Sequence, residues 1–77
     1  MQWRLPNVMD IRRRVGHNLR VIREAQGLSQ EALAFESNLH RTYISGVERG
    51  VRNPTVVVLN KIAKALNIPP AELLKDA

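Results

Sequence analysis

The chain has 77 residues, which is enough for one small domain and leaves little room for a second. It has no cysteine, which excludes disulfides, thiolate metal sites and thiol catalysis, and no apolar run approaches the roughly 20 residues of a membrane span. Twelve lysine and arginine residues against seven aspartate and glutamate residues give a formal charge of +5, which favours a polyanionic partner.

The first predicted helix runs from about residue 8 to residue 26, and residues 1–7 form an N-terminal extension. Asn7 is a suitable N-cap, and Gly27 is a natural C-terminal stop. Polar and charged residues interrupt the apolar stretch at the start of the chain, so we expect no signal peptide there. The buried stripe of the helix is predicted to consist of Ile11, Val15, Leu19 and Ile22.

A second helix is predicted from its N-cap Ser29 to about Ser37. Its buried side is predicted to consist of Ala32, Leu33 and Phe35. Asn38 follows, and asparagine adopts the left-handed backbone conformation more readily than most residues. We therefore expect a tight turn between two helices at residues 37–39.

The third predicted helix spans about residues 41–49 and ends at Gly50. Ile44 and Val47 are expected to face inward, and Gly46 permits a close approach of a neighbouring segment. Two short helices joined by a tight turn are the outline of a helix-turn-helix.

A fourth helix is predicted from its N-cap Thr55 to about Leu66, after a loop at Asn53 and Pro54. Pro70 is expected to open a short fifth helix. In the fourth helix Leu59, Ile62, Ala63 and Leu66 are expected to face inward, and the short fifth helix carries Leu73 and Leu74. The predicted fold is therefore all-α, a compact five-helix bundle over residues 8–77 in which the second and third helices form the helix-turn-helix.

Several motifs in register resemble the Cro and phage-repressor helix-turn-helix family, also called the XRE family. They are GLSQEALA at residues 27–34, YISGVERG at residues 43–50, RNPT at residues 52–55, and the apolar positions of the fourth helix. The run NLHRTYIS at residues 38–45 also resembles the controller proteins of restriction-modification systems. Two positions depart from the family pattern. Asn38 stands where the family often has glycine, and His40 stands where it often has Ser, Thr or Asp.

The resemblance implies a fold of the lambda-repressor type and a sequence-specific DNA-binding regulator. It implies that Gln30, at the start of the second helix, holds a phosphate and braces the recognition helix. Arg41 and Thr42, at the start of the third helix, would meet base edges, where arginine suits guanine and a threonine methyl suits thymine. The expected DNA-binding set is Ser29, Gln30, His40, Arg41, Thr42, Tyr43, Ser45, Arg49, Arg52 and Asn53.

Several of these roles have alternatives that the sequence leaves open. Tyr43 either packs on the core or contacts a phosphate, and Asn53 either contacts DNA or only shapes its loop. Arg41 either reads a base or contacts only a phosphate, and Arg49 and Arg52 contact phosphates or are solvated surface charges. The three consecutive arginines at 12–14 cannot share one helix face, because successive residues turn by about 100°. One or two of them are candidates for long-range attraction to DNA.

Two further assignments concern structure and assembly. The resemblance pairs Arg23 with Glu48 in a largely buried ion pair that links the first helix to the end of the third. It also implies a homodimer, for which Val56, Val57 and Leu74 are candidate interface residues unless they cap the domain's own core. Trp3 and Leu5 are further candidates for docking on a partner.

An enzymatic role is not expected. The sequence contains no paired carboxylates, glycine-rich phosphate loop or cluster of metal ligands, and its only histidines are His17 and His40. We expect double-stranded DNA and a second copy of the chain as partners, with no cofactor, metal, membrane or evident small-molecule effector. The expected location is the cytoplasm of a bacterium or of a phage host. The alternatives are an antitoxin or other partner-dependent interaction module on the same fold, and a nonspecific nucleic-acid binder.

Overall fold

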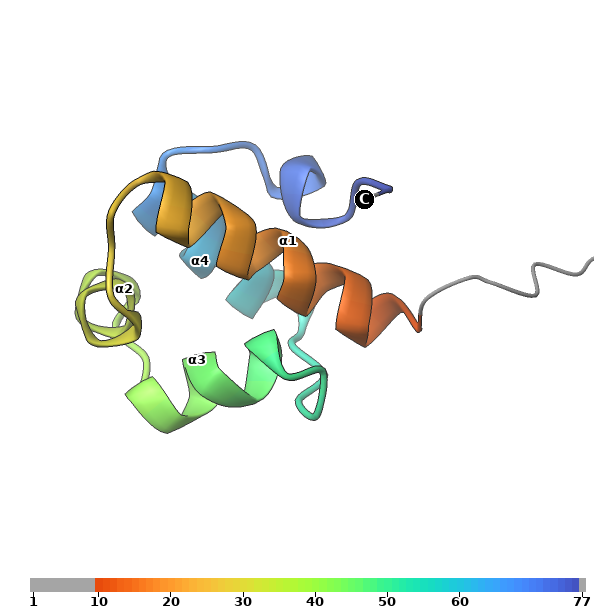
Figure 1. The fold of residues 1–77 in the computed structure, drawn as a ribbon, viewed down its shortest axis with the longest axis horizontal. Helices are drawn as coiled ribbons and strands as arrows, with labels where there is room; N and C mark the ends of the chain where they lie inside the picture. The colour runs from red at the N-terminus through yellow and green to blue at the C-terminus, as the bar shows by residue number, and fades with distance from the viewer. Residues whose placement is uncertain (1–9, 77) are drawn as a thin grey trace, which may run out of the picture.

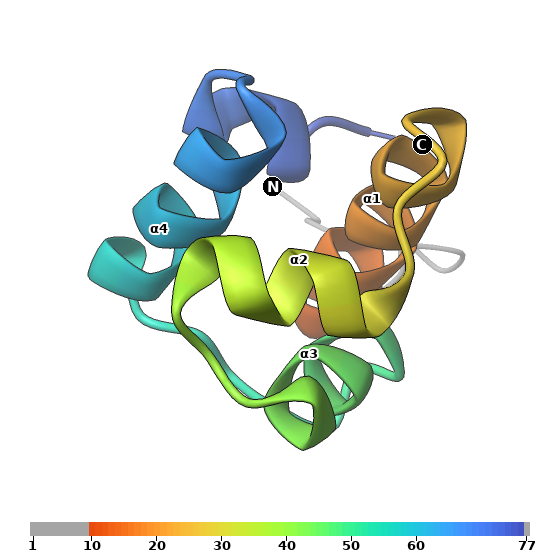
Figure 2. The ribbon, with the colours of Figure 1, turned by 90° about the vertical axis from the view of Figure 1, so that its left-hand side faces the viewer.

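The computed structural model describes residues 10–76 of the chain. These residues contain four α-helices and one 3₁₀ helix, joined by short loops. Figure 1 shows α1 crossing the middle of the molecule, with η1 on one side of it and α3 on the other. In Figure 2, α1 and α4 lie on either side of α2. The elements in chain order are α1 (Ile11–Ala25), α2 (Gln30–Ser37), α3 (Arg41–Glu48), α4 (Val56–Leu66) and η1 (Pro70–Leu73).

The caps and turns between α1 and α4 follow the local chemistry of the sequence. The Ser29 hydroxyl accepts a hydrogen bond from the Ala32 amide at 3.0 Å, and the Thr55 hydroxyl accepts one from the Val58 amide at 3.1 Å. Gly27 ends α1 with a φ of 72°, which confirms its predicted role as the stop. Asn67 ends α4 in the left-handed conformation, with a φ of 59°.

The start of the first helix differs from the prediction. Asp10 has φ −51° and ψ 137°, so it is not helical, and α1 begins at Ile11. The Asp10 carboxylate caps the helix by accepting a hydrogen bond from the Arg12 amide at 2.8 Å. The predicted start at residue 8 was therefore wrong. The predicted cap Asn7, together with Trp3 and Leu5, lies outside the described residues.

The predicted bundle of five helices was also wrong, because residues 10–76 contain four α-helices and the expected fifth helix is a single turn of 3₁₀ helix, η1, over Pro70–Leu73. Its hydrogen bonds join residues three apart, from the Glu72 amide to the Pro69 carbonyl and from the Leu74 amide to the Ala71 carbonyl. Proline has no amide hydrogen, and a segment this short forms too few bonds to offset the cost of starting an α-helix. Leu73 is nevertheless fully buried, so the turn closes one end of the core.

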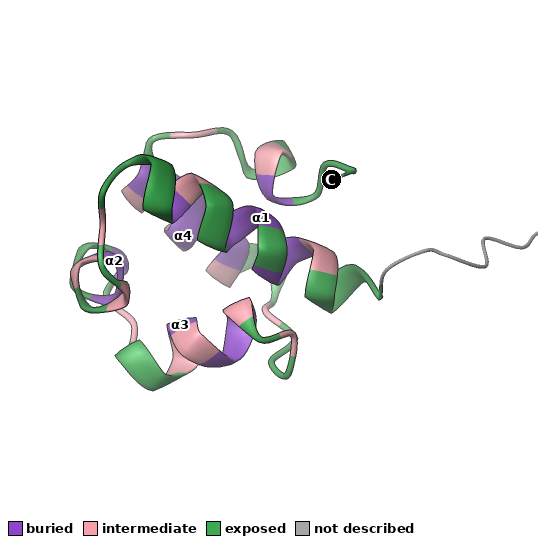
Figure 3. Ribbon diagram, viewed as in Figure 1, coloured by how far each residue is buried: buried purple, intermediate pink, exposed green. Residues whose placement is uncertain are grey.

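The core forms between the four α-helices and η1, as Figure 3 shows by burial. Its buried apolar residues are Val15, Leu19, Leu33, Ala34, Ile44, Val47, Leu59, Ile62, Ala63, Leu66 and Leu73. Two predicted core residues were wrong. Phe35 is 81% exposed, because it lies about 200° around α2 from Leu33, and Ile11 is half exposed at the first turn of α1.

Three contacts that fix α1 on its neighbours were not predicted from the sequence. The buried Asn18 amide donates to the Leu73 carbonyl at 3.0 Å and to the Lys75 carbonyl at 2.8 Å. The Gln26 amide donates to the Leu66 carbonyl at 2.8 Å, beyond the end of α1. Gly16 lies against the backbone at the end of α3. Asn18, a polar residue beside the apolar stripe, was the one detectable signal among these.

Candidate DNA interface

The turn between α2 and α3 holds the two helices at a fixed angle. Asn38 adopts the left-handed conformation, with φ 58° and ψ 45°, as its sequence position predicted. The Leu39 amide then donates to the Ala34 carbonyl at 2.9 Å, and the Leu39 side chain packs against the core. Figure 2 shows α2 lying across the view while α3 is seen end-on below it. The turn therefore carries α3 to one side of the molecule, where its outer face is open.

One face of α3 is anchored in the core and the other is free. Ile44 and Val47 are fully buried, as predicted. Arg41 and Thr42, in the first turn of the helix, are exposed, and Ser45 is half-buried one turn later. Figure 3 shows this exposed first turn at the outer end of α3. The anchored residues fix the direction in which the first turn points, so its polar side chains are held outward.

His40 precedes α3 without capping it by its side chain. Its backbone is extended, with φ −79° and ψ 145°, and it makes no side-chain cap hydrogen bond. The residue is exposed. The imidazole therefore stands beside Arg41 and Thr42 at the open end of the helix, where it is available to an external partner.

Glu48, the last residue of α3, joins three helices. Its carboxylate accepts hydrogen bonds from Arg23 of α1, at 2.6 Å from Nε and 3.1 Å from Nη2. It also accepts one from Gln30 Nε2 of α2 at 3.0 Å. A further arginine nitrogen, Nη1, donates to the Leu28 carbonyl at 2.7 Å. The structure thus brings together the residues that the resemblance paired, and it adds the start of α2 to the same contact.

This junction is shielded from water and charged. The side chains of Arg23 and Glu48 are 9% and 4% exposed. The hydrogen bond to Glu48 raises the pKa of Arg23 above its already high ordinary value, so the guanidinium stays charged. Buried pairs of this kind fix geometry more reliably than they add net stability. The end of α3 is therefore held at one orientation relative to α1 and α2.

The exit of α3 carries two exposed arginines. Arg49 Nε lies 3.4 Å from the Ser45 hydroxyl, one turn back along the helix. Arg52 turns back over α3, with its guanidinium carbon 6.0 Å from the centre of the Tyr43 ring. Tyr43 is half-buried and packs against the core, and Asn53 is exposed in the loop that follows.

Gly46 makes room for the Arg52 side chain. A β-carbon at Gly46 would lie 2.6 Å from Cγ of Arg52, which is closer than such atoms approach. The sequence predicted a close approach at this glycine, and the structure shows that the approaching group is an arginine side chain of the exit loop. Because Gly46 has no side chain, the Arg52 side chain covers α3 at this turn.

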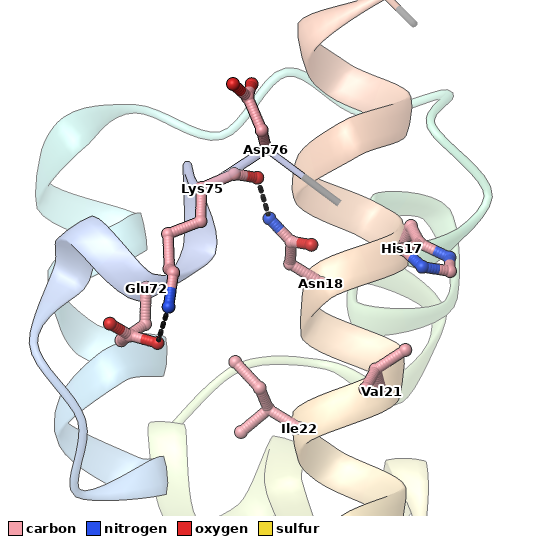
Figure 4. A pocket seen from close by; sticks show the side chains of 7 residues that line it. All are labelled: His17, Asn18, Val21, Ile22, Glu72, Lys75 and Asp76. Carbon is pink, nitrogen blue, oxygen red and sulfur yellow. Dashed lines mark hydrogen bonds and ion pairs between the residues drawn. The ribbon is translucent and has the colours of Figure 1, made fainter.

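A shallow cleft lies elsewhere, between α1 and the C-terminal segment, on the opposite side of α1 from α3 (Figures 1 and 4). It measures about 300 Å³ and is lined by His17, Asn18, Val21, Ile22, Glu72, Lys75 and Asp76. Figure 4 shows the Asn18 amide bound to the Lys75 carbonyl, and Lys75 Nζ at 3.3 Å from Glu72. The Asn18 amide therefore ties the C-terminal segment to α1, while the Lys75–Glu72 contact lies within that segment.

Three apolar side chains that the sequence suggested for a subunit contact are exposed in the single chain. Val56 is 81% exposed, Val57 is 69% exposed, and Leu74 is 44% exposed. Val56 and Val57 begin α4, and Leu74 follows η1, which packs against α4. None of the three caps the core of this chain.

Comparisons with known proteins agree with this geometry. A helix-turn-helix family model matches residues 19–73. The control protein C.BamHI of Bacillus amyloliquefaciens is 50% identical over 66 residues, which cover 84% of this chain and 82% of that protein. The structure of the restriction-modification controller protein C.AhdI from Aeromonas hydrophila matches with a TM-score of 0.79 and 53% identity, over 80% of this chain and 94% of that one.

The match to a third relative covers more of the chain. The structure of the hypothetical transcription factor NHTF from Neisseria matches with a TM-score of 0.84 and 37% identity, covering 97% of this chain and 86% of that one. Within residues 10–76, no helix has both the length and the apolar character needed to cross a membrane. The family match covers more than half of the chain and includes both helices of the motif. The chain therefore belongs to the XRE-type helix-turn-helix family of DNA-binding transcriptional regulators.

Proposed function

We propose that the chain acts as a homodimeric regulator of the restriction-modification controller type, which binds a pseudo-palindromic operator through α3. The observation that carries the proposal is the first turn of α3. It exposes Arg41 and Thr42, while Ile44, Val47 and the Glu48 junction hold the rest of the helix still. Recognition helices of this motif read base edges with their N-terminal residues.

The reading groups are assigned by their chemistry. Arg41 presents a guanidinium that matches the two acceptors of guanine in the major groove, and the Thr42 methyl suits thymine. Ser45, one turn later, offers a hydroxyl to either kind of base. Gly46 contributes no side chain at this surface, so base contacts from the second turn fall to Ser45.

The phosphate contacts are assigned to groups on either side of α3. The start of α2 presents free amides beside Ser29, and Gln30 Nε2 carries a second hydrogen that the bond to Glu48 does not use. Arg49, Arg52 and Asn53, at the exit of α3, are assigned to phosphates on the other side of the groove. His40 and Tyr43 flank the reading residues and complete the interface.

Dimerisation is assigned to the apolar side chains of Val56, Val57 and Leu74. Apolar side chains this exposed gain free energy when a second copy covers them. A twofold pair of chains would place its two recognition helices one helical turn of DNA apart, about 34–36 Å. The controller assignment follows from the relatives whose names describe control or controller proteins.

The operator is tested by selection from a random duplex library with the purified chain at about 150 mM salt. We expect enrichment of two inverted half-sites separated by about one helical turn. Enrichment of a single half-site would contradict the dimeric mode. A folded chain that binds bulk DNA at low salt without any enrichment would contradict sequence-specific recognition.

The dimer surface is tested separately by sedimentation equilibrium of Val57→Glu. A charge at this exposed position leaves the core untouched and, near the start of α4, suits the helix dipole. We expect the dimer to dissociate to monomers, while Val51→Glu, at another exposed valine in the α3–α4 loop, remains dimeric. A Val57→Glu protein as dimeric as the wild type would place the interface elsewhere.

A further inference from the structure

The three consecutive arginines at the start of α1 have different surroundings, although the sequence alone does not separate them. Arg12 binds the Asp10 carboxylate through Nε and Nη2, both at 3.2 Å. Arg14 is partly buried and lies 3.0 Å from the Asp76 carboxylate. Two of the three guanidinium groups are thus paired with carboxylates of this chain.

Arg13 is placed differently. It is exposed, and no carboxylate of residues 10–76 lies within 4.0 Å of its guanidinium. Its stem packs on Gly50, where an added β-carbon would lie 2.7 Å from Cγ and 3.2 Å from Cα of Arg13. Because Gly50 has no side chain, the start of α1 reaches the exit of α3.

This contact places Arg13 beside the segment that carries Arg49 and Arg52. Arg49 immediately precedes Gly50, Arg52 lies two residues beyond it, and neither forms an ion pair within residues 10–76. Arg13 adds a third cation to this end of α3. Arg13, Arg49 and Arg52 therefore add positive charge to two adjacent segments, which favours a polyanionic partner.

The position of Arg13 relative to α3 is fixed by the packing of α1. A β-carbon at Gly16, one turn after Arg13, would collide with the carbonyl oxygens of Val47 and Glu48, so the two backbones touch there. Two turns further on, Arg23 holds the Glu48 carboxylate. A DNA duplex seated on α3 therefore meets the start of α1 in a predetermined position.

We propose that Arg13 is a further phosphate-binding residue, which forms a basic cluster with Arg49 and Arg52 and extends the DNA backbone contact from the helix-turn-helix onto α1. The assignment rests on the proposed seating of DNA on α3. Guanidinium groups suit phosphate because their planar donors match its oxygens. Arg12 and Arg14 are weaker candidates for this role, because each already binds a carboxylate that competes with phosphate.

The test compares Arg13→Gln with Arg12→Gln, a variant that removes the same charge from the adjacent position. The affinity for the selected duplex is measured by fluorescence anisotropy at several salt concentrations. Each phosphate contact lowers the slope of log affinity against log salt by about 0.9. We expect Arg13→Gln to make the slope shallower by about one per chain. Arg12→Gln should keep the wild-type slope, and so should Arg13→Lys, which retains the cation.

The outcomes separate this assignment from the proposed function. Equal slopes for Arg13→Gln and Arg12→Gln, with wild-type binding intact, would overturn the role of Arg13 alone. A slope for Arg13→Lys as shallow as that of Arg13→Gln would also overturn it, because the charge would then not be the cause. A wild-type chain that selects no duplex would overturn the proposed function and this assignment together. Circular dichroism of each variant verifies that the helices are retained.

Discussion

Arg23 donates two hydrogen bonds to the Glu48 carboxylate, at 2.6 Å and 3.1 Å, and thereby ties α1 to the last residue of α3. The same carboxylate accepts a bond from Gln30 at the start of α2. All three helices that would meet a duplex therefore share one buried contact. The orientation of the recognition helix depends on this contact as well as on the turn at Asn38.

Removing the cation of this pair should destabilise the fold strongly. Arg23→Met leaves the Glu48 carboxylate buried without its main partner, and breaking a buried pair from one side costs about 3–5 kcal/mol. The measurement is the free energy of unfolding from urea titration. Arg20→Met, which removes an exposed partner of Glu24, should cost less than about 1 kcal/mol. Similar costs for the two variants would contradict the burial of the pair.

Gly16 should tolerate no side chain. In Gly16→Ala the new β-carbon would meet backbone oxygens of Val47 and Glu48, which cannot rotate away, so we expect a loss of about 1–3 kcal/mol despite the better helix propensity of alanine. DNA affinity should fall too, because α3 is displaced. Gly27→Ala meets no atom within 4 Å and carries only the strain of its positive φ, so it should lower stability but keep the affinity of the folded protein. Unchanged affinity in Gly16→Ala would show that α3 is not displaced.

The N-cap of α1 should make stability depend on pH in acid. Hydrogen bonds from the Arg12 side chain and then from its amide lower the pKa of Asp10 below its ordinary value. A lowered folded pKa means that the stabilisation is complete above the unfolded pKa of about 3.9, and it is lost as the pH falls through the folded value. Asn caps helices well, so Asp10→Asn removes the charge and keeps the cap.

The expected result is a lower melting temperature for Asp10→Asn than for the wild type at neutral pH, with a difference that closes as the pH falls below the unfolded pKa of about 3.9 and through the lower folded pKa. Thermal melts followed by circular dichroism across this range provide the measurement. Glu36→Gln, at an exposed position without an ion pair among the described residues, serves as the control for loss of a carboxylate. A difference that persists undiminished at pH 2 would rule out the charge as its cause.

Arg52 should contribute affinity without sequence preference. Arg52 lies in the loop at the exit of α3, and its side chain turns back along the helix, with the guanidinium carbon 6.0 Å from the centre of the Tyr43 ring. Because Arg52 is assigned to a phosphate, Arg52→Ala is expected to weaken binding to all duplexes by a similar factor and to make the salt slope shallower by about one per chain. Anisotropy titrations on the selected duplex and on a scrambled one measure both effects. A loss confined to the selected duplex would instead make Arg52 a base-reading residue.

Local chemistry made much of the fold predictable from the sequence. Ser29 and Thr55 are caps because each hydroxyl satisfies an amide a few residues on, and Asn38 forms the turn because of its own backbone preference. The same reasoning was wrong where two residues, Asn7 and Asp10, were both suitable N-caps of the first helix, and where a helix was very short. Asp10 caps α1, and the segment at Pro70 forms only a 3₁₀ turn.

Contacts between distant parts of the chain could not be predicted in this way. In the sequence, Gly16 is only a residue of low helix propensity. Its contact with the end of α3 depends on how the two helices pack. Phe35 was expected inside because it is apolar, but α2 is too short for its spacing to identify the buried face. The candidate interface residues followed from family resemblance. The different surroundings of Arg12, Arg13 and Arg14 depend on contacts that form only in the folded chain.

The reading of bases by the first turn of α3 is tested most directly by repeating the duplex selection with Arg41→Ala. Arg41 is exposed, so the variant should fold as the wild type does. We expect the affinity for the wild-type operator to fall by about 1–3 kcal/mol, and the enriched motif to lose its preference at one position in each half-site. An Arg41→Ala protein that selects the same motif with the same preference at every position would contradict base recognition by this residue.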